Sequence, residues 1–203
     1  MILSQVDYNL VPIIALICNV IVVSGNCLRY YQNQLIPWSF TLPVILVSIP
    51  FAFLGGNTLL DEALFIEILG WALLASGLMM LYRHQEIISS SVKLNSSLGK
   101  VISIVVAAGL GFLAGLVGIG GGIFFAPILH LTRVLPTRKI AAFASIFILV
   151  NSVAGLIGQF NKYDNLDILW FDRQYAWLLI AVFIGGQMGS HLSIKRIKPI
   201  ILR

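Results

Sequence analysis

Charged side chains are scarce in this sequence. They make up 10% of its 203 residues, and hydrophobic side chains make up 59%, whereas a soluble domain averages about 25% charged residues. This composition excludes an ordinary soluble domain and predicts a polytopic membrane protein with several spans of about 20 residues each. The formal net charge of +5 resides on basic residues near the ends of apolar segments. Such a distribution indicates orientation in a lipid bilayer rather than binding of nucleic acid.

Residues for metal, redox or hydrolytic chemistry are equally few. Cys18 and Cys27 lie too far apart along one predicted helix to form a disulfide, and no ligand cluster has metal-binding spacing. No Ser, His and Asp share a common membrane depth, and no acidic residue falls in the middle of an apolar segment. The glycine-rich stretch matches neither a dinucleotide fingerprint nor a phosphate-binding loop. We therefore expect no enzyme and no cofactor.

Six apolar segments predict an all-α membrane helix bundle. They cover about residues 10–28, 40–60, 63–82, 101–133, 140–160 and 175–194. The polar stretch 83–100 separates a first membrane repeat, 1–82, from a second, 101–203. Residues 1–8 contain no basic residue and so do not resemble a signal peptide.

Glycines interrupt the fourth segment. Gly118, Gly120, Gly121 and Gly122 each cost a helix interior about 1 kcal/mol relative to alanine. In hydrocarbon, the backbone groups freed by a break need cover from protein or from a water-filled cavity. A break here would therefore make a poor lipid-facing element and a good wall for a solute site. The alternative is that glycines let helices pack closely, because Gly111-x-x-x-Gly115 and Gly118-x-x-x-Gly122 both fit small-x-x-x-small spacing.

The charges favour a re-entrant fourth segment. If the segment crossed the bilayer fully, the basic residues would divide almost evenly between the two sides. If it dips in and returns, one side collects every basic residue except Lys162 and Arg173, which is the excess expected in the cytoplasm. The loop 83–100 and the C-terminal tail are then predicted to be cytoplasmic.

Two parts of the chain are similar at an offset of about 130 residues. The stretch 17–22 aligns with 149–154, Trp38 aligns with Trp170, and 53–57 aligns with 183–187 after a two-residue slip. With a re-entrant fourth segment the two copies are inverted, a common architecture of secondary transporters. The first copy lacks a counterpart of the glycine stretch ahead of it, and the second lacks a closing span, so each repeat is expected to be incomplete.

Polar residues within the apolar segments are the candidate solute ligands. Asn19 and Asn151 occupy matching positions in the two copies, and a buried amide needs a partner or a solute. The alternative for each is a hydrogen bond between helices. Ser145 and Ser152 face the choice between lining the same cavity and bonding to their own helix backbone. Weaker candidates are Asn57, Gln187 and His130.

The glycine stretch also resembles a known family. The pattern Gly111-x3-Gly115-x2-Gly118-x-Gly120-Gly121-Gly122-x4-Pro127-x-Leu129 is similar to the signature of the TauE/SafE permeases. The stretch 141–158 resembles the helix that follows this signature, and Gly185-Gly186-x-x-Gly189 resembles a later small-residue helix. The resemblance implies a permease of the bacterial inner membrane for sulfite, sulfonates or related organic anions.

These observations together predict a secondary transporter of a small anion. Its substrate-binding residues are expected to be Gly118, Gly120, Gly121, Gly122, Asn19, Asn151, Ser145 and Ser152. A helix that begins after Gly122 would direct free N–H groups and a positive dipole end at an anion. The expected partners are the solute, the bilayer and a second copy or another chain that completes the bundle, but no nucleic acid. The alternative is a truncated or non-transporting scaffold that packs with partner chains.

Overall fold

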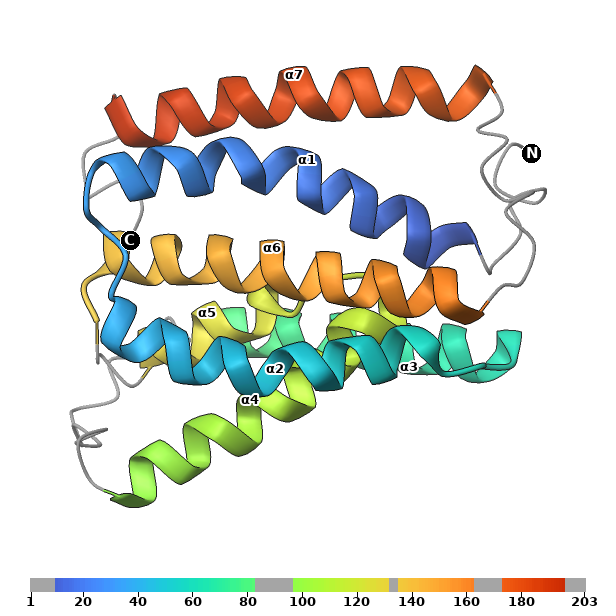
Figure 1. Ribbon diagram of the computed structural model, residues 1–203, viewed down its shortest axis with the longest axis horizontal. Coiled ribbons are helices and arrows are strands. Elements are labelled where there is room, and N and C mark those ends of the chain that lie inside the picture. The colour runs from blue at the N-terminus through green and yellow to red at the C-terminus, as the bar shows by residue number, and fades with distance from the viewer. Residues whose placement is uncertain (1–9, 83–96, 132–134, 163–172, 196–203) are drawn as a thin grey trace.

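The computed structural model describes residues 10–82, 97–131, 135–162 and 173–195. All regular structure in these ranges is α-helical, as predicted (Figure 1). The helices are α1 (Leu10–Gln32), α2 (Trp38–Asn57), α3 (Glu62–Tyr82), α4 (Ser97–Val117), α5 (Gly122–Leu131), α6 (Thr137–Lys162) and α7 (Arg173–Lys195).

The predicted segments correspond to these helices, with one division and small shifts at the ends. The fourth segment is two helices, α4 and α5, separated at residues 118–121. The last residues of the predicted linker 83–100 are helical, because α4 begins at Ser97. Within the described ranges, three helices, α1, α2 and α6, are long and apolar enough to cross a membrane, and 103–117 and 177–189 are shorter apolar helical stretches.

The helices form a bundle with α1, α6 and α2 in its middle. The helices α1 and α6 lie side by side and run in opposite directions, with α7 on the outer side of α1 and α2 on the side of α6 away from α1 (Figure 1). The most extensive contacts of α2 are with α4 and α6. The middle of the bundle therefore consists of α1, α6 and α2, and α4 covers the far side of α2.

Small residues allow α2 and α4 to approach closely. A Cβ added to Gly115 of α4 would collide with the backbone carbonyl of Ala52 in α2, and one added to Gly111 would lie 2.6 Å from the carbonyl oxygen of Ser48. Gly55 of α2 faces the backbone of Phe112 in the same way. For Gly111 and Gly115, the alternative expectation of close helix packing is therefore confirmed.

Aromatic rings fix α5 against α6. Phe125 of α5 has its ring centroid 5.0 Å from that of Phe143 and 5.1 Å from that of Phe147, both in α6. Phe40 of α2 lies 5.2 Å from Phe143 on the other side. Offset and edge-on ring pairs of this kind contribute about 0.5–1.5 kcal/mol each beyond their buried area. The short helix α5 is thus held by its side chains although it has fewer than three turns.

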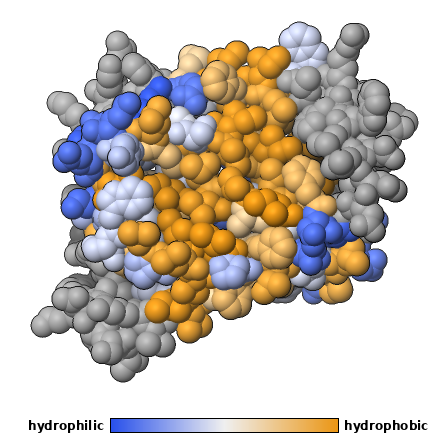
Figure 2. All heavy atoms as spheres, in the orientation of Figure 1, coloured by the Kyte–Doolittle hydropathy of each residue, from blue (hydrophilic) through white to orange (hydrophobic). Residues whose placement is uncertain are grey.

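The outer surface matches a protein embedded in lipid. Figure 2 shows apolar residues across the middle of one face and hydrophilic residues toward its two ends. Large side chains of α7 are exposed without cover from the described chain: Trp177, Leu178, Ile180, Phe183, Ile184 and Met188. Exposure of so large an apolar area to water would make the protein prone to aggregate, whereas a lipid bilayer accommodates it.

Candidate functional site

The break between α4 and α5 is a glycine turn. Gly118, Gly120 and Gly121 have φ values of +81°, +77° and +66°, in the left-handed region that residues with a Cβ rarely adopt. The amide of Gly118 donates to the carbonyl oxygen of Ala114 at 3.0 Å and closes the last turn of α4. The predicted break is confirmed, and these three glycines are required for their backbone conformation rather than for packing alone. We refer to residues 118–121 as the glycine turn.

The chain reverses direction at the glycine turn. At its start, Gly118 lies against the backbone of Pro12, near the beginning of α1. After it, Gly122 lies against Ile148 of α6, and Phe125 lies against Phe143, which is earlier in α6. The helix α5 therefore runs back along α6 in the opposite direction, and the end of α5 lies toward the end of the bundle from which α4 starts (Figure 1).

The glycine turn leaves amide groups available. The amide of Gly122 donates to Gly120, and the amides of Phe124 and Phe125 donate to Gly121. Within the described residues, the amides of Ile119, Gly120 and Gly121 have no acceptor. Free N–H groups before the first turn of a helix, together with the positive end of its dipole, favour a negatively charged or oxygen-rich ligand.

Side chains from α1 and α6 meet at the glycine turn. The Asn19 Nδ2 atom donates to the carbonyl oxygen of Gly118 at 3.0 Å. A Cβ placed on Gly120 would lie 3.1 Å from that Nδ2 atom and 3.3 Å from the Oγ atom of Ser152. Four of the predicted site residues, Asn19, Gly118, Gly120 and Ser152, are therefore neighbours. For Asn19 the structure shows the hydrogen bond between elements that was the alternative to a ligand role.

Asn151 and Ser152 are buried polar groups without partners. Both side chains are 0% exposed, and neither the Oδ1 and Nδ2 atoms of Asn151 nor the Oγ atom of Ser152 has a hydrogen-bond partner in the described structure. A polar group left in this state costs about 1–3 kcal/mol. Such groups are uncommon in folded proteins and call for an explanation.

The other predicted candidates lie elsewhere or bond differently. The Ser145 hydroxyl donates to the carbonyl oxygen of Ala141 at 2.9 Å, which is the backbone bond named as its alternative. Asn57 accepts from Asn161 at the end of α2, and Gln187 accepts from Arg29. The side chain of His130 lies outside the described residues.

Sequence reasoning missed Gln159. Its Nε2 atom donates to the carbonyl oxygen of Gly115 at 3.2 Å, and its Oε1 atom is buried without a partner. With Lys162 it lines a small cavity of about 10 Å³ between α6, α4 and the beginnings of α1 and α3, about the minimum for one water molecule. The signal was present, because Ser145, Ser152 and Gln159 recur every seven residues and so share one face of a helix.

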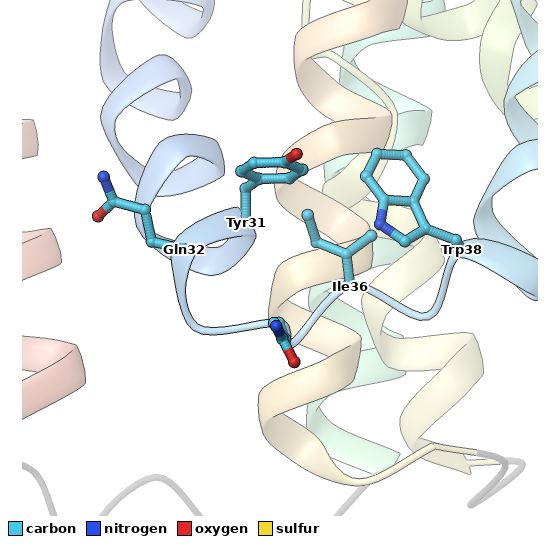
Figure 3. A pocket seen from close by; sticks show the side chains of 5 residues that line it. Tyr31, Gln32, Ile36 and Trp38 are labelled. Atoms are coloured by element: carbon cyan, nitrogen blue, oxygen red, sulfur yellow. The ribbon is translucent and has the colours of Figure 1, made fainter.

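A larger pocket lies at the corner between α1 and α2 (Figure 3). It encloses about 500 Å³ and is lined by Tyr31, Gln32, Gln34, Ile36 and Trp38. Tyr31 is twelve residues after Asn19, about 18 Å along a helix, so this pocket is separate from the glycine turn. Its aromatic and amide side chains suit the interfacial level of a bilayer, where Tyr and Trp are enriched.

The described residues bring together no three His, Cys, Asp or Glu side chains that could hold a metal ion. The polar groups at the glycine turn are amides and a hydroxyl. They can bind a solute through hydrogen bonds and the dipole of α5.

Comparison with known proteins identifies the family. The family model described as sulfite exporter TauE/SafE matches residues 1–203. The chain is 25% identical over 189 residues to a probable membrane transporter protein of Sinorhizobium fredii, covering 93% of this chain and 74% of that protein. It is 27% identical over 184 residues to a probable membrane transporter protein of Methanocaldococcus jannaschii, covering 86% of this chain and 66% of that protein. No solved structure gives a significant match. The chain therefore belongs to the TauE/SafE family of membrane transporters.

Proposed function

We propose that this chain moves a small anion, sulfite or a sulfonate, across the bacterial inner membrane, and that the glycine turn is its binding site. The observation that carries the proposal is the Ser152 hydroxyl, which is fully buried without a partner beside a turn with free amides. Asn151, the preceding residue of α6, is also buried without a partner. A solute oxygen at the turn would satisfy groups that the chain itself leaves unsatisfied. The description of the family as a sulfite exporter supports the choice of anion.

In this proposal the backbone supplies most of the donors. The amides of Ile119, Gly120 and Gly121 and the start of α5 bind the oxygens of the anion. Ser152 donates from α6, Asn19 holds the turn through Gly118, and Asn151 lies next to Ser152. Ser145 continues the same polar face of α6, and Gly122 places the first turn of α5 against that helix.

Two polar links between helices support an inverted repeat. One link joins Asn57 of α2 to Asn161 of α6 at 3.2 Å, and the other joins Gln187 of α7 to Arg29 of α1 at 3.4 Å. At the offset of about 130 residues, Asn57 aligns with Gln187, and Arg29 aligns with Asn161. The same contact thus recurs with its two helices exchanged, as a two-fold relation between α1–α2 and α6–α7 requires.

The paired glycines repeat this relation. Gly56 of α2 lies against the backbone of Gly155 in α6, and Gly186 of α7 lies against Val22 in α1. In both copies the outer helix uses a glycine to approach the central helix. The repeat thus supports a transporter with its solute site between two inverted units.

We also propose that the α4–α5 pair is re-entrant and that the protein crosses the membrane several times. The ten residues of α5 are about 15 Å long, half of the roughly 30 Å hydrocarbon core, so α5 alone does not cross it. Because α5 runs back along α6, the pair enters and leaves on one side. That side holds Arg29, Arg138 and Lys139 among the described residues, the excess expected in the cytoplasm.

The proposal is tested by flux measurements on reconstituted protein. Radiolabelled sulfite and methanesulfonate uptake is measured in liposomes with wild-type protein, with Ser152→Ala and with Ser48→Ala. Ser48 is the matched control, because it is equally buried but its hydroxyl already bonds to the carbonyl oxygen of Ile45 in its own helix.

We expect Ser152→Ala to lower the flux about tenfold, because a hydrogen bond to a charged solute contributes about 1.5–3 kcal/mol. Its thermal unfolding temperature should stay equal or rise, since the lost hydroxyl has no partner in the protein. Ser48→Ala should keep the wild-type flux. Wild-type flux in a folded Ser152→Ala would contradict the site, and absence of flux in folded wild-type protein would favour the alternative of a non-transporting scaffold.

A further inference from the structure

A small cavity lies beside the glycine turn. It is the cavity of about 10 Å³ that Gln159 and Lys162 line, and Pro12 and Leu116 line it too. A Cβ placed on Gly118 would lie 2.7 Å from the carbonyl oxygen of Pro12, and Leu116 is two residues before Gly118. Pro12 thus borders both the glycine turn and the cavity.

The cavity is at one end of the bundle. The helices α1 and α3 begin there, and α2 and α6 end there (Figure 1). Arg29 and Arg138, which the proposed topology places in the cytoplasm, lie near the opposite ends of α1 and α6. In the proposed orientation the cavity therefore faces the non-cytoplasmic side of the membrane.

Gln159 and Lys162 make this end of α6 polar. Gln159 is 1% exposed, its Nε2 atom donates to the carbonyl oxygen of Gly115, and its Oε1 atom has no partner in the described structure. Gln159 is seven residues after Ser152 and three residues before Lys162, so all three lie on one side of the helix. A polar side of α6 therefore leads from the glycine turn to the cavity and ends in a cation.

Lys162 supplies its positive charge in a partly apolar setting. Its side chain is half-buried, and Phe65 and Leu116, which line the cavity with it, are 5% and 4% exposed. Charges interact more strongly where walls of low dielectric constant replace water. The acidic residues Asp61 and Glu62, just before and at the start of α3, are exposed, so water and salt screen their repulsion of an anion.

We propose that this cavity is the non-cytoplasmic entry to the glycine turn and that Lys162 attracts the anion into it. The inference rests on the proposed function, because it adds an entry to the path of that same solute. A space of about 10 Å³ holds about one water molecule, so the structure shows the entry closed, with Gln159 linking α6 to α4 beside it. Passage of an anion requires these two helices to separate at the cavity.

The test measures from which face of the membrane Lys162 acts. Uptake of labelled methanesulfonate is followed in right-side-out membrane vesicles, where the solute meets the non-cytoplasmic face, and in inside-out vesicles. Lys162→Gln should raise the half-saturating concentration about threefold or more in right-side-out vesicles and leave it unchanged in inside-out vesicles. Lys139→Gln is the control and should keep the wild-type value in right-side-out vesicles, because Lys139 is exposed at the opposite end of α6.

A cysteine at the same position separates the charge of the side chain from its effect on folding. In the background Cys18→Ser and Cys27→Ser, Lys162→Cys is modified with 2-aminoethyl methanethiosulfonate or with the anionic 2-sulfonatoethyl reagent. In each case the thiolate attacks the reagent, a disulfide forms and methanesulfinate leaves. The added ammonium group should lower the half-saturating concentration toward the wild-type value, and the added sulfonate should raise it.

The outcomes distinguish the entry from the site. An unchanged half-saturating concentration in folded Lys162→Gln, an equal change at both faces, or equal effects of the two reagents would overturn the entry while leaving transport through the glycine turn intact. No uptake by the wild type above that of vesicles lacking the protein would overturn the proposed function and the entry with it.

Discussion

At the scale of single residues, Asn19 and Asn151 differ although the predicted repeat aligns them. Asn19 is bonded to the carbonyl oxygen of Gly118, so its amide stabilises the turn. Asn151 is 0% exposed and has no partner for either amide atom. The proposed function gives this amide a role in binding the solute.

This contrast predicts opposite effects of one substitution. Asn151→Leu should raise the free energy of unfolding by about 1–3 kcal/mol, because it removes unsatisfied polar atoms and keeps a similar volume. Asn19→Leu should lower it by about 0.6 kcal/mol, the mean for hydrogen bonds between membrane helices. Thermal unfolding in detergent measures both changes.

The paired variants also separate a structural role from a binding role. If Asn151 binds the solute, Asn151→Leu is more stable and transports less. A destabilised Asn151→Leu would show that the amide has a partner in the folded protein, which would remove the main reason for assigning it to the site.

The sequence could identify these residues but not their bonds. Polar residues in apolar segments are visible by position, so Asn19, Asn151 and Ser152 were predicted as candidates. Whether Ser145 bonds to its own helix or faces a solute depends on its side-chain rotamer, which spacing does not determine. Gln159 was missed because it lies near the end of its segment, where a polar residue is ordinary.

At the scale of single elements, the glycines of α4 and of the glycine turn serve two purposes. Gly111 and Gly115 allow close packing on α2, whereas Gly118, Gly120 and Gly121 take positive φ values. The sequence offered packing and breakage as alternatives, and the structure assigns them to different glycines. The end of α4 at Val117 separates the two groups, because Gly111 and Gly115 lie within the helix and the other three glycines follow it.

The packing role is testable within one helix. In Gly115→Val the new side chain would collide with the backbone of Ala52 and force α2 and α4 apart, so the free energy of unfolding should fall by about 1–3 kcal/mol or more. Gly109→Val is the control, because nothing lies within 4 Å of a Cβ at that position. Equal thermal unfolding temperatures for the two variants would show that α2 and α4 are not in close contact in the membrane.

At the scale of the whole molecule, the positions of the helices along the sequence could be predicted almost completely. Apolar segments of about 20 residues identify the helices because a bilayer fixes their length. The sequence does not specify which helices touch. The central place of α1 and α6, and the covering of α2 by α4, depend on side-chain fit over many positions.

The orientation of the α4–α5 pair follows from where its two ends lie, and single cysteines can locate them. In a background of Cys18→Ser and Cys27→Ser, the variants Lys100→Cys, Arg138→Cys and Asp61→Cys are exposed to a membrane-impermeant thiol reagent in intact cells. Lys100 lies in the first turn of α4, Arg138 follows α5 at the start of α6, and Asp61 lies between α2 and α3.

A re-entrant pair places Lys100 and Arg138 together on the cytoplasmic side and Asp61 on the opposite side. We therefore expect Asp61→Cys to be labelled in intact cells, and the other two to be labelled only after the membrane is permeabilised. A pair that crosses the bilayer would place Lys100 and Arg138 on opposite sides, and a single one of the two variants would then react in intact cells. That result would also contradict the proposed inversion between the two predicted repeats, because α1 and α6 would then cross in the same direction.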